Sequence, residues 1–527
     1  MNPGRAVTRL TVRQVRRGTL VVLAVTAGMS ALVVTTYHSA LGGAEGAAAL
    51  AALAANPAIR TLFGEPVALD TAGGFTVWRT GTVLAVLLSV WGMLAATRIS
   101  RGEEDAGRWD LLLAGRLTPS AVIRRQLGVL TVAVAGSGTA VTGALALSGT
   151  PLTGAALHGA GLALAGAFGV AVALLTAQVL PTRAGATGAA TAVLGVALLL
   201  RMVGDGIGAL GWLRWLSPYG LLALTRPYLD DRVAPLLVLG AGTAAVAALA
   251  LVLAGRRDLR AGLLAPTTSR PPRRWLLGSV EAFALRRLLR PLTGWAAGIG
   301  AYFLLIGLLA ESLTAFLADN PLFAEAAAEA GFAGLVTVRG YAATLFALLA
   351  VPVGIFAALR LADFGAAEAD RRLTSLHAQP LRRGRLLAAE VVAALAGAAV
   401  LLTAAGTLTW LGATIVDAGL SLPAALAGAW NVLPVVLLAL GAAVLALGWT
   451  PRAVAAVGAL PGAGGFLLKV TAESAGQPEV GRLSPFAHLA AVPSTGPNWP
   501  ASLAMAGVAV AVAALGWWGY HRRDLRG

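Results

Sequence analysis

The sequence predicts an all-α polytopic membrane protein made of two tandem six-helix repeats. Hydrophobic residues make up 57% of the 527-residue chain, charged residues make up 12%, and the mean hydropathy is +0.78. These values lie far from those of soluble globular domains. Apolar runs of about 20 residues, the length that crosses a bilayer, recur along the chain. The same short motifs appear once in each half, which predicts a duplicated unit.

Two motifs define the repeat and report one register. Leu216–Tyr219 (Leu-Ser-Pro-Tyr) returns as Leu483–Phe486, and Arg256–Arg260 (Arg-Arg-Asp-Leu-Arg) returns as Arg522–Arg526, so the two offsets agree to within a single position. In a membrane, two similar halves usually enclose a transport pathway. We therefore expect a first six-helix repeat over residues 1–262, a cytoplasmic linker over 263–277 and a second repeat over 278–527.

Twelve apolar runs are expected to cross the membrane, six in each half. In the first half they cover residues 19–37, 78–98, 127–148, 156–180, 186–203 and 234–254. In the second half they cover residues 295–313, 340–361, 389–412, 425–448, 453–470 and 501–519. The runs at 186–203 and 453–470 are short and glycine-rich, so their helices are the least strongly predicted.

Small residues recur at four-residue spacing within these runs. One stripe consists of Gly161, Ala165 and Gly169, and another of Ala135, Thr139 and Gly143. Such stripes predict close helix packing, because small side chains let two backbones approach each other. The chain has no cysteine, and its five histidines lack the paired spacing of metal ligands. For His158, which lies inside a run, we expect a hydrogen bond between helices rather than a ligand role.

The distribution of arginine predicts the orientation. Arginines cluster before the first run, in the second, sixth and eighth connections and at the C-terminus, within Arg5–Arg17, Arg98–Arg125, Arg256–Arg290, Arg371–Arg385 and Arg522–Arg526. By the positive-inside rule, both termini of this multi-pass protein are cytoplasmic and its location is the cell membrane. The formal net charge of +16 then reflects topology and attraction to anionic lipid. No soluble segment is long enough to bind nucleic acid.

The second connection and its counterpart in the second half are candidate docking sites for a cytoplasmic partner. Acidic residues lead, leucines follow and a proline ends each element, which is typical of a short amphipathic surface helix. Glu104 and Arg108 are four residues apart, as are Glu368 and Arg372, so a helical ion pair is expected in each half. A solvated charged loop is the alternative. The candidate residues are Glu103, Glu104, Asp105, Arg108, Trp109, Leu111, Leu112, Glu368, Asp370, Arg371, Arg372 and Leu373.

A second set of symmetric residues lies at the outer ends of the predicted spans. Arg201 precedes Asp205 by four residues, and Lys469 precedes Glu473 by four, in register with the Leu-Ser-Pro motif. An outer gate and simple snorkelling of the basic residues to the interface are both open here. The full set of outer-gate candidates is Arg201, Asp205, Lys469, Glu473, Trp212, Trp215, Ser217, Pro218, Ser484 and Pro485.

The chain shows no energy source of its own. A phosphate-binding loop needs the pattern Gly-x-x-x-x-Gly-Lys-[Ser/Thr], and Lys469, the only lysine, does not stand in one. A proton-driven carrier would place titratable groups deep in the bilayer. Asp205, Glu311, Asp417 and Glu473 fall near outer span ends, and Asp363 near an inner end. We therefore expect the energy to arrive through a partner protein.

The two-repeat layout, the acidic segment before Leu111 and the Leu-Ser-Pro and Arg-Arg-Asp-Leu motifs resemble those of the ABC-2-type permeases of actinobacteria. They are most similar to the twelve-span exporters of polyketide antibiotics, the tetronasin-resistance type. The resemblance implies a type V, ABC-2-like exporter fold with amphipathic helices at Val7–Arg17 and Val280–Arg290. It also implies coupling helices at Glu103–Leu113 and Glu368–Leu376, and short outer helices at Ile207–Arg226 and Gly476–Leu489.

What the resemblance implies for function is the permease subunit of an ATP-driven multidrug efflux system. Such a subunit extrudes hydrophobic or amphiphilic compounds such as antibiotics, binds no cofactor and is not an enzyme on its own. ATP and Mg²⁺ would be bound by separate ATPase subunits, expected in two copies. The alternative is a proton-coupled carrier of the major-facilitator type, although the loop after the second span lacks that family's Gly-x-x-x-Asp-Arg-x-Gly-Arg pattern. A polytopic membrane enzyme would need paired carboxylates, for which Glu65 and Asp70 are the candidates.

Overall fold

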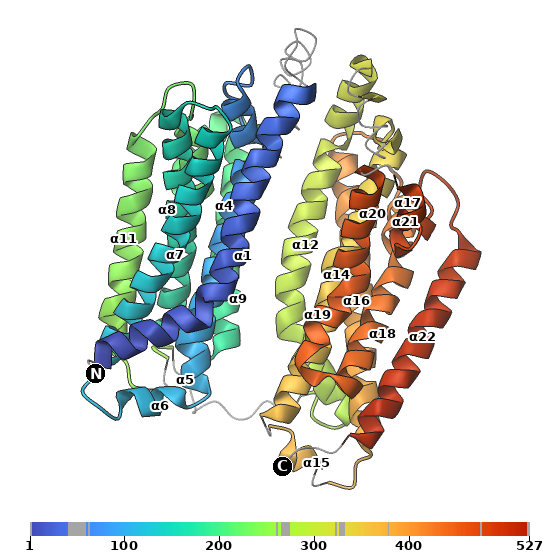
Figure 1. Ribbon diagram of the computed structural model, residues 1–527. Helices are drawn as coiled ribbons and strands as arrows, with labels where there is room; N and C mark the ends of the chain where they lie inside the picture. The colour runs from blue at the N-terminus through green and yellow to red at the C-terminus, as the bar shows by residue number, and fades with distance from the viewer. Residues whose placement is uncertain are drawn as a thin grey trace. The chain divides into compact units, whose positions relative to one another are not determined.

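The computed structural model describes residues 3–40, 60–61, 64–259, 262–264, 275–321, 324–325, 333–370, 372–377, 379–474 and 477–523 (Figure 1). Within these residues all regular secondary structure is helical. In the part of the chain that the structure describes, twelve helices are long and apolar enough to cross a membrane, as the sequence predicts, so the chain is a multi-pass membrane protein. The chain divides into two compact units, Met1–Arg270 and Pro271–Gly527, and this division falls inside the expected linker.

Unit 1 has six spanning helices in its described part. They are α1 (Pro3–Ala40), α4 (Ala72–Thr97), α7 (Pro119–Leu147), α8 (Leu152–Val179), α9 (Arg183–Gly206) and α11 (Ala234–Ala254). The π-turn η1 (Arg98–Gly102) and the short helices α5 (Glu103–Asp105) and α6 (Arg108–Leu113) lie between α4 and α7. The 3₁₀ helix η2 (Gly208–Leu216) and α10 (Pro218–Leu224) lie between α9 and α11, where short outer helices are expected.

Unit 2 repeats this order with more interruptions. Its described elements are α12 (Val280–Asp319), η3 (Ala333–Val336), α14 (Val338–Ala369), α15 (Thr374–His377), α16 (Arg383–Ile415), α17 (Leu422–Trp430), α18 (Leu433–Trp449), η4 (Pro451–Ala453), α19 (Val454–Ala459), η5 (Leu460–Gly464), α20 (Gly465–Ser474), α21 (Pro478–Gly481), η6 (Pro485–His488) and α22 (Trp499–Arg522). The span predicted over 453–470 is present as Pro451–Lys469 and contains the π-turn η5. Pro461 lies in this turn, and proline cannot donate the backbone hydrogen bond that a continuous helix requires.

The amphipathic segment expected at Val7–Arg17 is continuous with the first span rather than a separate helix. Both belong to α1, which Figure 1 shows bent, with its N-terminal part lying across unit 1. Gly4, Val7, Thr11 and Val15 are buried on one face. The arginines of this segment, Arg5, Arg9, Arg13, Arg16 and Arg17, are exposed. This is the pattern of a helix that lies at a membrane interface.

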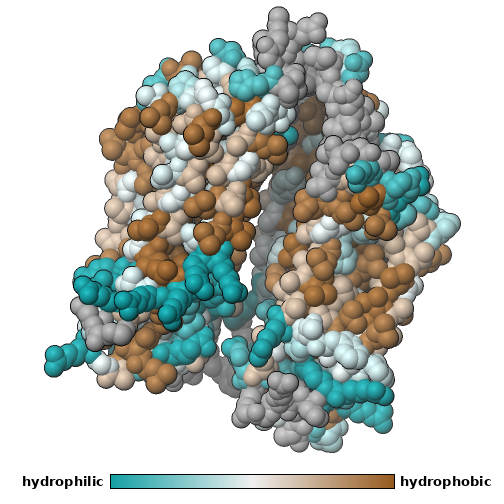
Figure 2. Space-filling model, viewed as in Figure 1, coloured by the Kyte–Doolittle hydropathy of each residue, from teal (hydrophilic) through white to brown (hydrophobic). Residues whose placement is uncertain are grey.

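We call the end of each unit that carries its Arg-Arg-Asp-Leu motif the arginine-rich end. In Figure 1 the N-terminus, α5 and α6 lie at this end of unit 1, and α15 and the C-terminus lie at this end of unit 2. Figure 2 shows hydrophobic residues over the middle of the visible face of each unit, with hydrophilic residues gathered towards its ends. This distribution matches a bilayer-spanning region between two aqueous or headgroup layers.

Small residues bring the spanning helices into backbone contact, but only one of the two predicted stripes does so. A Cβ atom on Gly169 would lie 2.4 Å from the Ser89 carbonyl oxygen of α4, and the Ser89 hydroxyl donates to the carbonyl of Ala165. The stripe of Ala135, Thr139 and Gly143 was expected to pack as well, and this is wrong. Ala135 and Thr139 are exposed, and nothing lies within 4 Å of a Cβ on Gly143.

The packing face of α7 instead runs through Gly138. A Cβ on Gly138 would lie 2.3 Å from the carbonyl oxygen of Gly159 in α8, and one on Gly159 would lie 2.4 Å from that of Gly138. Four-residue spacing identifies a face of small residues, but it does not say which face meets a neighbour when several faces contain them. The reciprocal glycine contact therefore fixes the distance between α7 and α8.

We predict that Gly138→Ala destabilises unit 1 by about 1–3 kcal/mol, the usual cost of overpacking a close helix contact. Gly143→Ala is the matched control on the same helix, because open space surrounds that position. Thermal unfolding of both variants in detergent measures the difference. Equal midpoints for the two variants would contradict the packing described here.

Candidate functional site

A buried ion pair ties the second connection of unit 1 to the unit's Arg-Arg-Asp-Leu motif. The guanidinium of Arg257 donates to both carboxylate oxygens of Glu104, at 2.6 Å (Nη1–Oε1) and 2.5 Å (Nη2–Oε2). The two side chains are 3% and 1% exposed. Arg257 Nε also donates to Gln178 Oε1 at 2.7 Å, near the end of α8. One arginine after α11 thus holds the loop that follows α4 and the end of α8.

Unit 2 contains the same arrangement. Arg523 binds the carboxylate of Glu368, which also accepts a hydrogen bond from the Tyr520 hydroxyl at 2.6 Å. Arg523 Nη1 donates to the carbonyl of Leu447, near the end of α18, at 2.9 Å. Here too, one arginine at the end of the last span holds the end of the second span and the end of the fourth.

We call these two interactions the end clamps: Glu104–Arg257 in unit 1 and Glu368–Arg523 in unit 2. The two acids are related by nearly the same offset along the chain as the two arginines. In each unit, the acidic segment after the second span therefore binds the Arg-Arg-Asp-Leu motif. Arg–carboxylate pairs of this kind are strong and geometrically specific. Because both partners are largely buried, loss of either one leaves an uncompensated charge.

The helical ion pairs that the sequence predicts are not formed. Arg108 pairs with Glu103 rather than Glu104, with its Nε 2.5 Å from Oε2, and Arg372 pairs with Asp370 rather than Glu368. The reason is that neither segment is the single surface helix expected. Gly107, with φ of 73°, breaks Glu103–Leu113 into α5 and α6, whereas Glu368 belongs to the last turn of α14.

The first candidate docking segment exposes only part of its predicted surface. Trp109 is buried in the core and Leu112 packs against it, whereas Leu111 is 81% exposed and Asp110 is exposed beside it. Asp105 accepts a hydrogen bond from the backbone amide of Arg183 at 2.8 Å, which attaches α5 to the start of α9. The part of this segment that can meet a partner is therefore α6, with Leu111 projecting from it.

The second candidate segment is smaller. Leu373 is buried, so it anchors the loop instead of offering an apolar contact, while Asp370 and Arg372 are exposed. Arg371 lies outside the described residues. The helix α15 has four residues, compared with six in α6. The two docking candidates therefore differ in both length and exposed apolar surface.

At the opposite end of unit 1, the outer candidates form a network of charges. The predicted pair is present, with Arg201 Nε 2.6 Å from Asp205 Oδ2, and both side chains are buried, so Arg201 does not snorkel. Arg214 and Arg226 bind the two oxygens of Glu65 at 2.8 and 2.9 Å. Trp212 and Trp215 are exposed at 58% and 48%, as expected for an interfacial element.

Electrostatics at Glu65 favour its ionised form. Partial burial alone would raise the pKa of Glu65, but the hydrogen bond from Arg214 and the charges of Arg226, Arg214 and Arg60 hold it below its ordinary value. Asp70, the other carboxylate considered for an enzyme, is exposed. The network therefore holds Glu65 between the guanidinium groups of Arg214 and Arg226.

The Leu-Ser-Pro motif has the same structural role in both units. Ser217 donates to the carbonyl of Ala197 in α9 at 2.6 Å, and Ser484 donates to that of Gly465 in α20 at 2.7 Å. Each buried serine also caps the short helix that follows, which begins at Pro218 or Pro485. The motif therefore fastens a short helix to the fifth span of its unit.

The second predicted outer pair is Lys469 and Glu473. Lys469 lies in α20, and the side chain of Glu473 lies outside the described part.

His158 does not make the interhelical hydrogen bond expected for it. The side chain is fully buried in α8, and neither ring nitrogen has a hydrogen-bond partner among the described residues. It lines a cavity of about 40 Å³ together with Trp78, Arg201, Tyr219 and Arg226. A cavity of this size has room for water, which is the usual partner of an otherwise unsatisfied buried polar group.

A buried carboxylate in unit 2 was missed in the sequence. Glu390 Oε1 accepts from Arg287 Nη1 of α12 at 2.8 Å, and Glu390 Oε2 accepts from Arg360 Nη2 of α14 at 2.7 Å. Glu390 falls inside the run predicted over 389–412, so a search of each span for ionisable residues finds it. In the register that aligns the two clamp acids, its counterpart in unit 1 is Gln126, which donates to the carbonyl of Ile99.

Among the described residues, no group of three or more His, Asp or Glu side chains could hold a metal ion.

Comparison with known proteins adds independent information. Residues 277–521 match the family model described as multidrug efflux system permease Rv1217c, C-terminal domain. The chain is also 31% identical, over 490 residues, to the multidrug efflux system permease protein Rv1217c of Mycobacterium tuberculosis (strain ATCC 25618 / H37Rv). The alignment covers 91% of this chain and 87% of that protein.

We predict that acid weakens the outer charge network through Glu65. Because its folded-state pKa is lowered from the ordinary value of 4.5, Glu65 contributes stability above pH 4.5 that is lost as the pH falls through the folded-state pKa. Glu65→Gln should remove this part of the pH dependence, whereas Asp70→Asn, at an exposed neighbour, should retain it. Thermal unfolding in detergent between pH 7 and pH 3 measures the effect. The same pH dependence in wild type and Glu65→Gln would refute it.

Proposed function

Because this chain belongs to the family of Rv1217c-type multidrug efflux permeases, we propose that it is the membrane subunit of an ATP-driven exporter of the ABC-2 type. The ATPase subunits would be separate chains, since the only lysine of the sequence does not stand in a phosphate-binding loop. The relative is named as the permease of an efflux system, which supports further components. The arginine distribution supports cytoplasmic termini and docking at the arginine-rich ends.

The observation that carries this proposal is the end clamp. In unit 1, Glu104 lies in α5, four residues before the candidate docking helix α6 begins, and its carboxylate is held by Arg257, which follows α11. A force applied to α6 would therefore reach α4 and α11 directly and α8 through Gln178. Breaking a buried pair costs about 3–5 kcal/mol, so the joined helix ends would move together as a rigid group.

Two clamps in one chain support two ATPase subunits, one for each unit. ATP and Mg²⁺ would be bound between these subunits, and their approach on binding ATP would displace both docking elements. The shorter α15 and the buried Leu373 make the second contact smaller than the first. We infer that the two docking sites are not equivalent, with α6 providing the larger apolar contact.

The substrates would be hydrophobic or amphiphilic compounds such as antibiotics and other drugs. The relative is named for multidrug efflux, and the spanning helices are dominated by Ala, Gly, Leu and Val. A pathway lined by such residues offers few hydrogen-bond partners, so it discriminates weakly among apolar molecules. We infer export rather than import because the relative is named as an efflux permease.

A proton-coupled carrier is the second candidate, and Glu390 is the observation that favours it. A carboxylate inside a spanning helix is a common element of proton pathways. Both oxygens of Glu390 are, however, bound by the guanidinium groups of Arg287 and Arg360, which gives the residue a structural role in joining α12, α14 and α16. The ATP-driven mechanism therefore remains the better-supported proposal.

We predict that the protein, purified gently from its own membranes, contains a stoichiometric ATPase in two copies by native mass measurement. Leu111→Asp should reduce the amount of retained ATPase, because it places a charge on the most exposed apolar residue of α6. Leu147→Asp is the matched control, since Leu147 is 92% exposed at the opposite end of the unit. A chain that comes alone and transports substrate until a protonophore is added would reject the proposal in favour of the carrier.

We also predict that the second end clamp is required for coupling. Glu368→Arg and Arg523→Glu should each destabilise unit 2 by about 3 kcal/mol, and the double variant should recover part of this loss. Arg523→Lys keeps the positive charge but loses the planar guanidinium that donates several hydrogen bonds at once. This variant should fold normally but transport less drug per ATP hydrolysed. Exchanging the exposed pair Asp370 and Arg372 should cost less than about 1 kcal/mol. Unchanged transport per ATP in Arg523→Lys would exclude the coupling role.

A further inference from the structure

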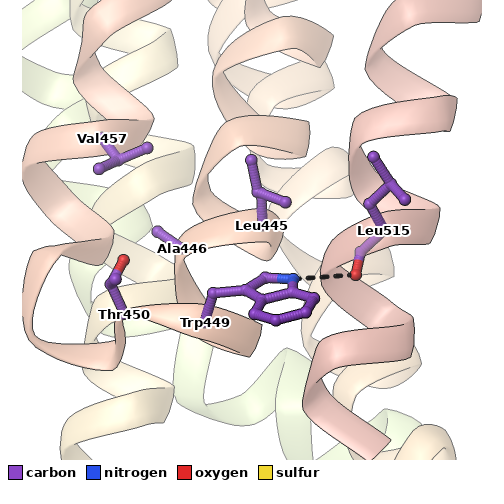
Figure 3. Close-up of a pocket in the computed structure, with 6 residues that line it drawn as sticks. All are labelled: Leu445, Ala446, Trp449, Thr450, Val457 and Leu515. Atoms are coloured by element: carbon purple, nitrogen blue, oxygen red, sulfur yellow. Dashed lines mark hydrogen bonds between the residues drawn. The ribbon is translucent and has the colours of Figure 1, made fainter.

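An apolar groove lies on the surface of unit 2 near its arginine-rich end. It is lined by Leu445, Ala446, Trp449, Thr450, Val457 and Leu515, and its volume is about 330 Å³ (Figure 3). Figure 3 shows the Trp449 indole across the groove, with its Nε1 donating to the carbonyl of Leu515 at 3.2 Å. Trp449 and Leu515 are 56% and 57% exposed. The groove therefore combines a fixed indole with an open apolar surface between α18, α19 and α22.

A series of neighbouring side chains leads from this groove to a positive charge. The rings of Trp449 and Trp518 are 5.7 Å apart, and the Arg522 guanidinium lies 3.9 Å from the centre of the Trp518 ring. Arg522 and Arg452 are exposed, and Arg452 follows the groove residue Thr450 by two positions. The cationic groups are thus near the arginine-rich end, and the apolar lining extends towards the middle of the spanning helices.

We propose that this groove binds one anionic phospholipid, with an acyl chain against Leu445, Val457 and Leu515 and the phosphate at Arg522. Tryptophan prefers the headgroup level of a membrane, and basic pockets between spanning helices on the cytoplasmic side bind anionic headgroups. A volume of 330 Å³ is within the range of small-molecule sites. The combination of an apolar groove and a nearby guanidinium matches an anionic lipid better than a neutral one.

The site is specific to unit 2. In the register that aligns Arg522 with Arg256, Trp449 corresponds to Arg183 and Trp518 to Val252. Unit 1 therefore has neither aromatic residue at the equivalent positions, although it keeps the arginine. The lipid site lies beside the second end clamp, because Arg522 precedes Arg523 and Arg523 binds the carbonyl of Leu447, two residues before Trp449. Bound lipid would consequently stabilise the arginine end of that clamp.

The test uses the full chain purified in detergent and titrated with phosphatidylglycerol, with phosphatidylcholine of the same acyl chains as the neutral comparison. Native mass measurement counts the lipids retained. We expect one phosphatidylglycerol to bind more tightly than phosphatidylcholine, and Arg522→Gln to weaken this binding about fivefold, the effect of one basic residue near an anionic surface. Leu515→Trp should block the groove without removing any charged contact.

Two matched controls lie elsewhere in the same unit. Trp499→Ala changes an exposed tryptophan at the other end of α22, and Arg482→Gln changes an exposed arginine outside that helix. Both variants should bind phosphatidylglycerol as the wild type does. Equal binding of the two lipids to wild type, or unchanged phosphatidylglycerol binding in both Arg522→Gln and Leu515→Trp, would overturn the proposal. This outcome is independent of whether an ATPase is present.

Discussion

The contact between a loop carboxylate and the arginine at the end of each unit is the constraint on which the arginine-rich ends depend. Glu104 and Arg257 have almost no access to solvent, and Arg101 adds a second guanidinium 3.2 Å from the same carboxylate while donating from its own Nε to the carbonyl of Ala177. Loss of Glu104 would leave two guanidinium groups beside each other without their shared carboxylate, which is costly in a buried position. The ends of α4, α8 and α11 are therefore fixed relative to one another.

The opposite end of each unit is held in a different way. There a buried serine hydroxyl joins a short helix to the fifth span. At this end of unit 1, Arg201 also pairs with Asp205, and Arg214 pairs with Glu65. Between the two ends, helices meet through small residues such as Gly138 and Gly159, which contribute little polar interaction. The strong polar contacts are thus concentrated at the ends, whereas the middle is held by close packing.

The sequence was sufficient for the spans and for the repeated motifs, because hydropathy and recurrence are properties of the chain itself. It did not identify the partners of those motifs. Spacing suggested Glu104 with Arg108, whereas the structure pairs Glu104 with Arg257, 153 residues away. Gly107 is what breaks the local helix, and a positive φ at one glycine is not predictable from i, i+4 spacing. The sequence likewise placed Trp109 on the surface that would contact a partner. The structure buries Trp109 in the core, because α6 packs against the spanning helices.

The two units share their clamps and serine contacts but differ in the elements beside them. Unit 1 has the longer docking helix, the exposed Leu111 and the outer charge network. Unit 2 has the π-turn in the eleventh span, the Glu390 ion-pair network and the tryptophan groove. The contacts that both units share join helix ends, and the elements that differ lie beside them. Under the proposals above, α6 of unit 1 would provide the larger contact for an ATPase subunit, and the tryptophan groove of unit 2 would contact a membrane lipid.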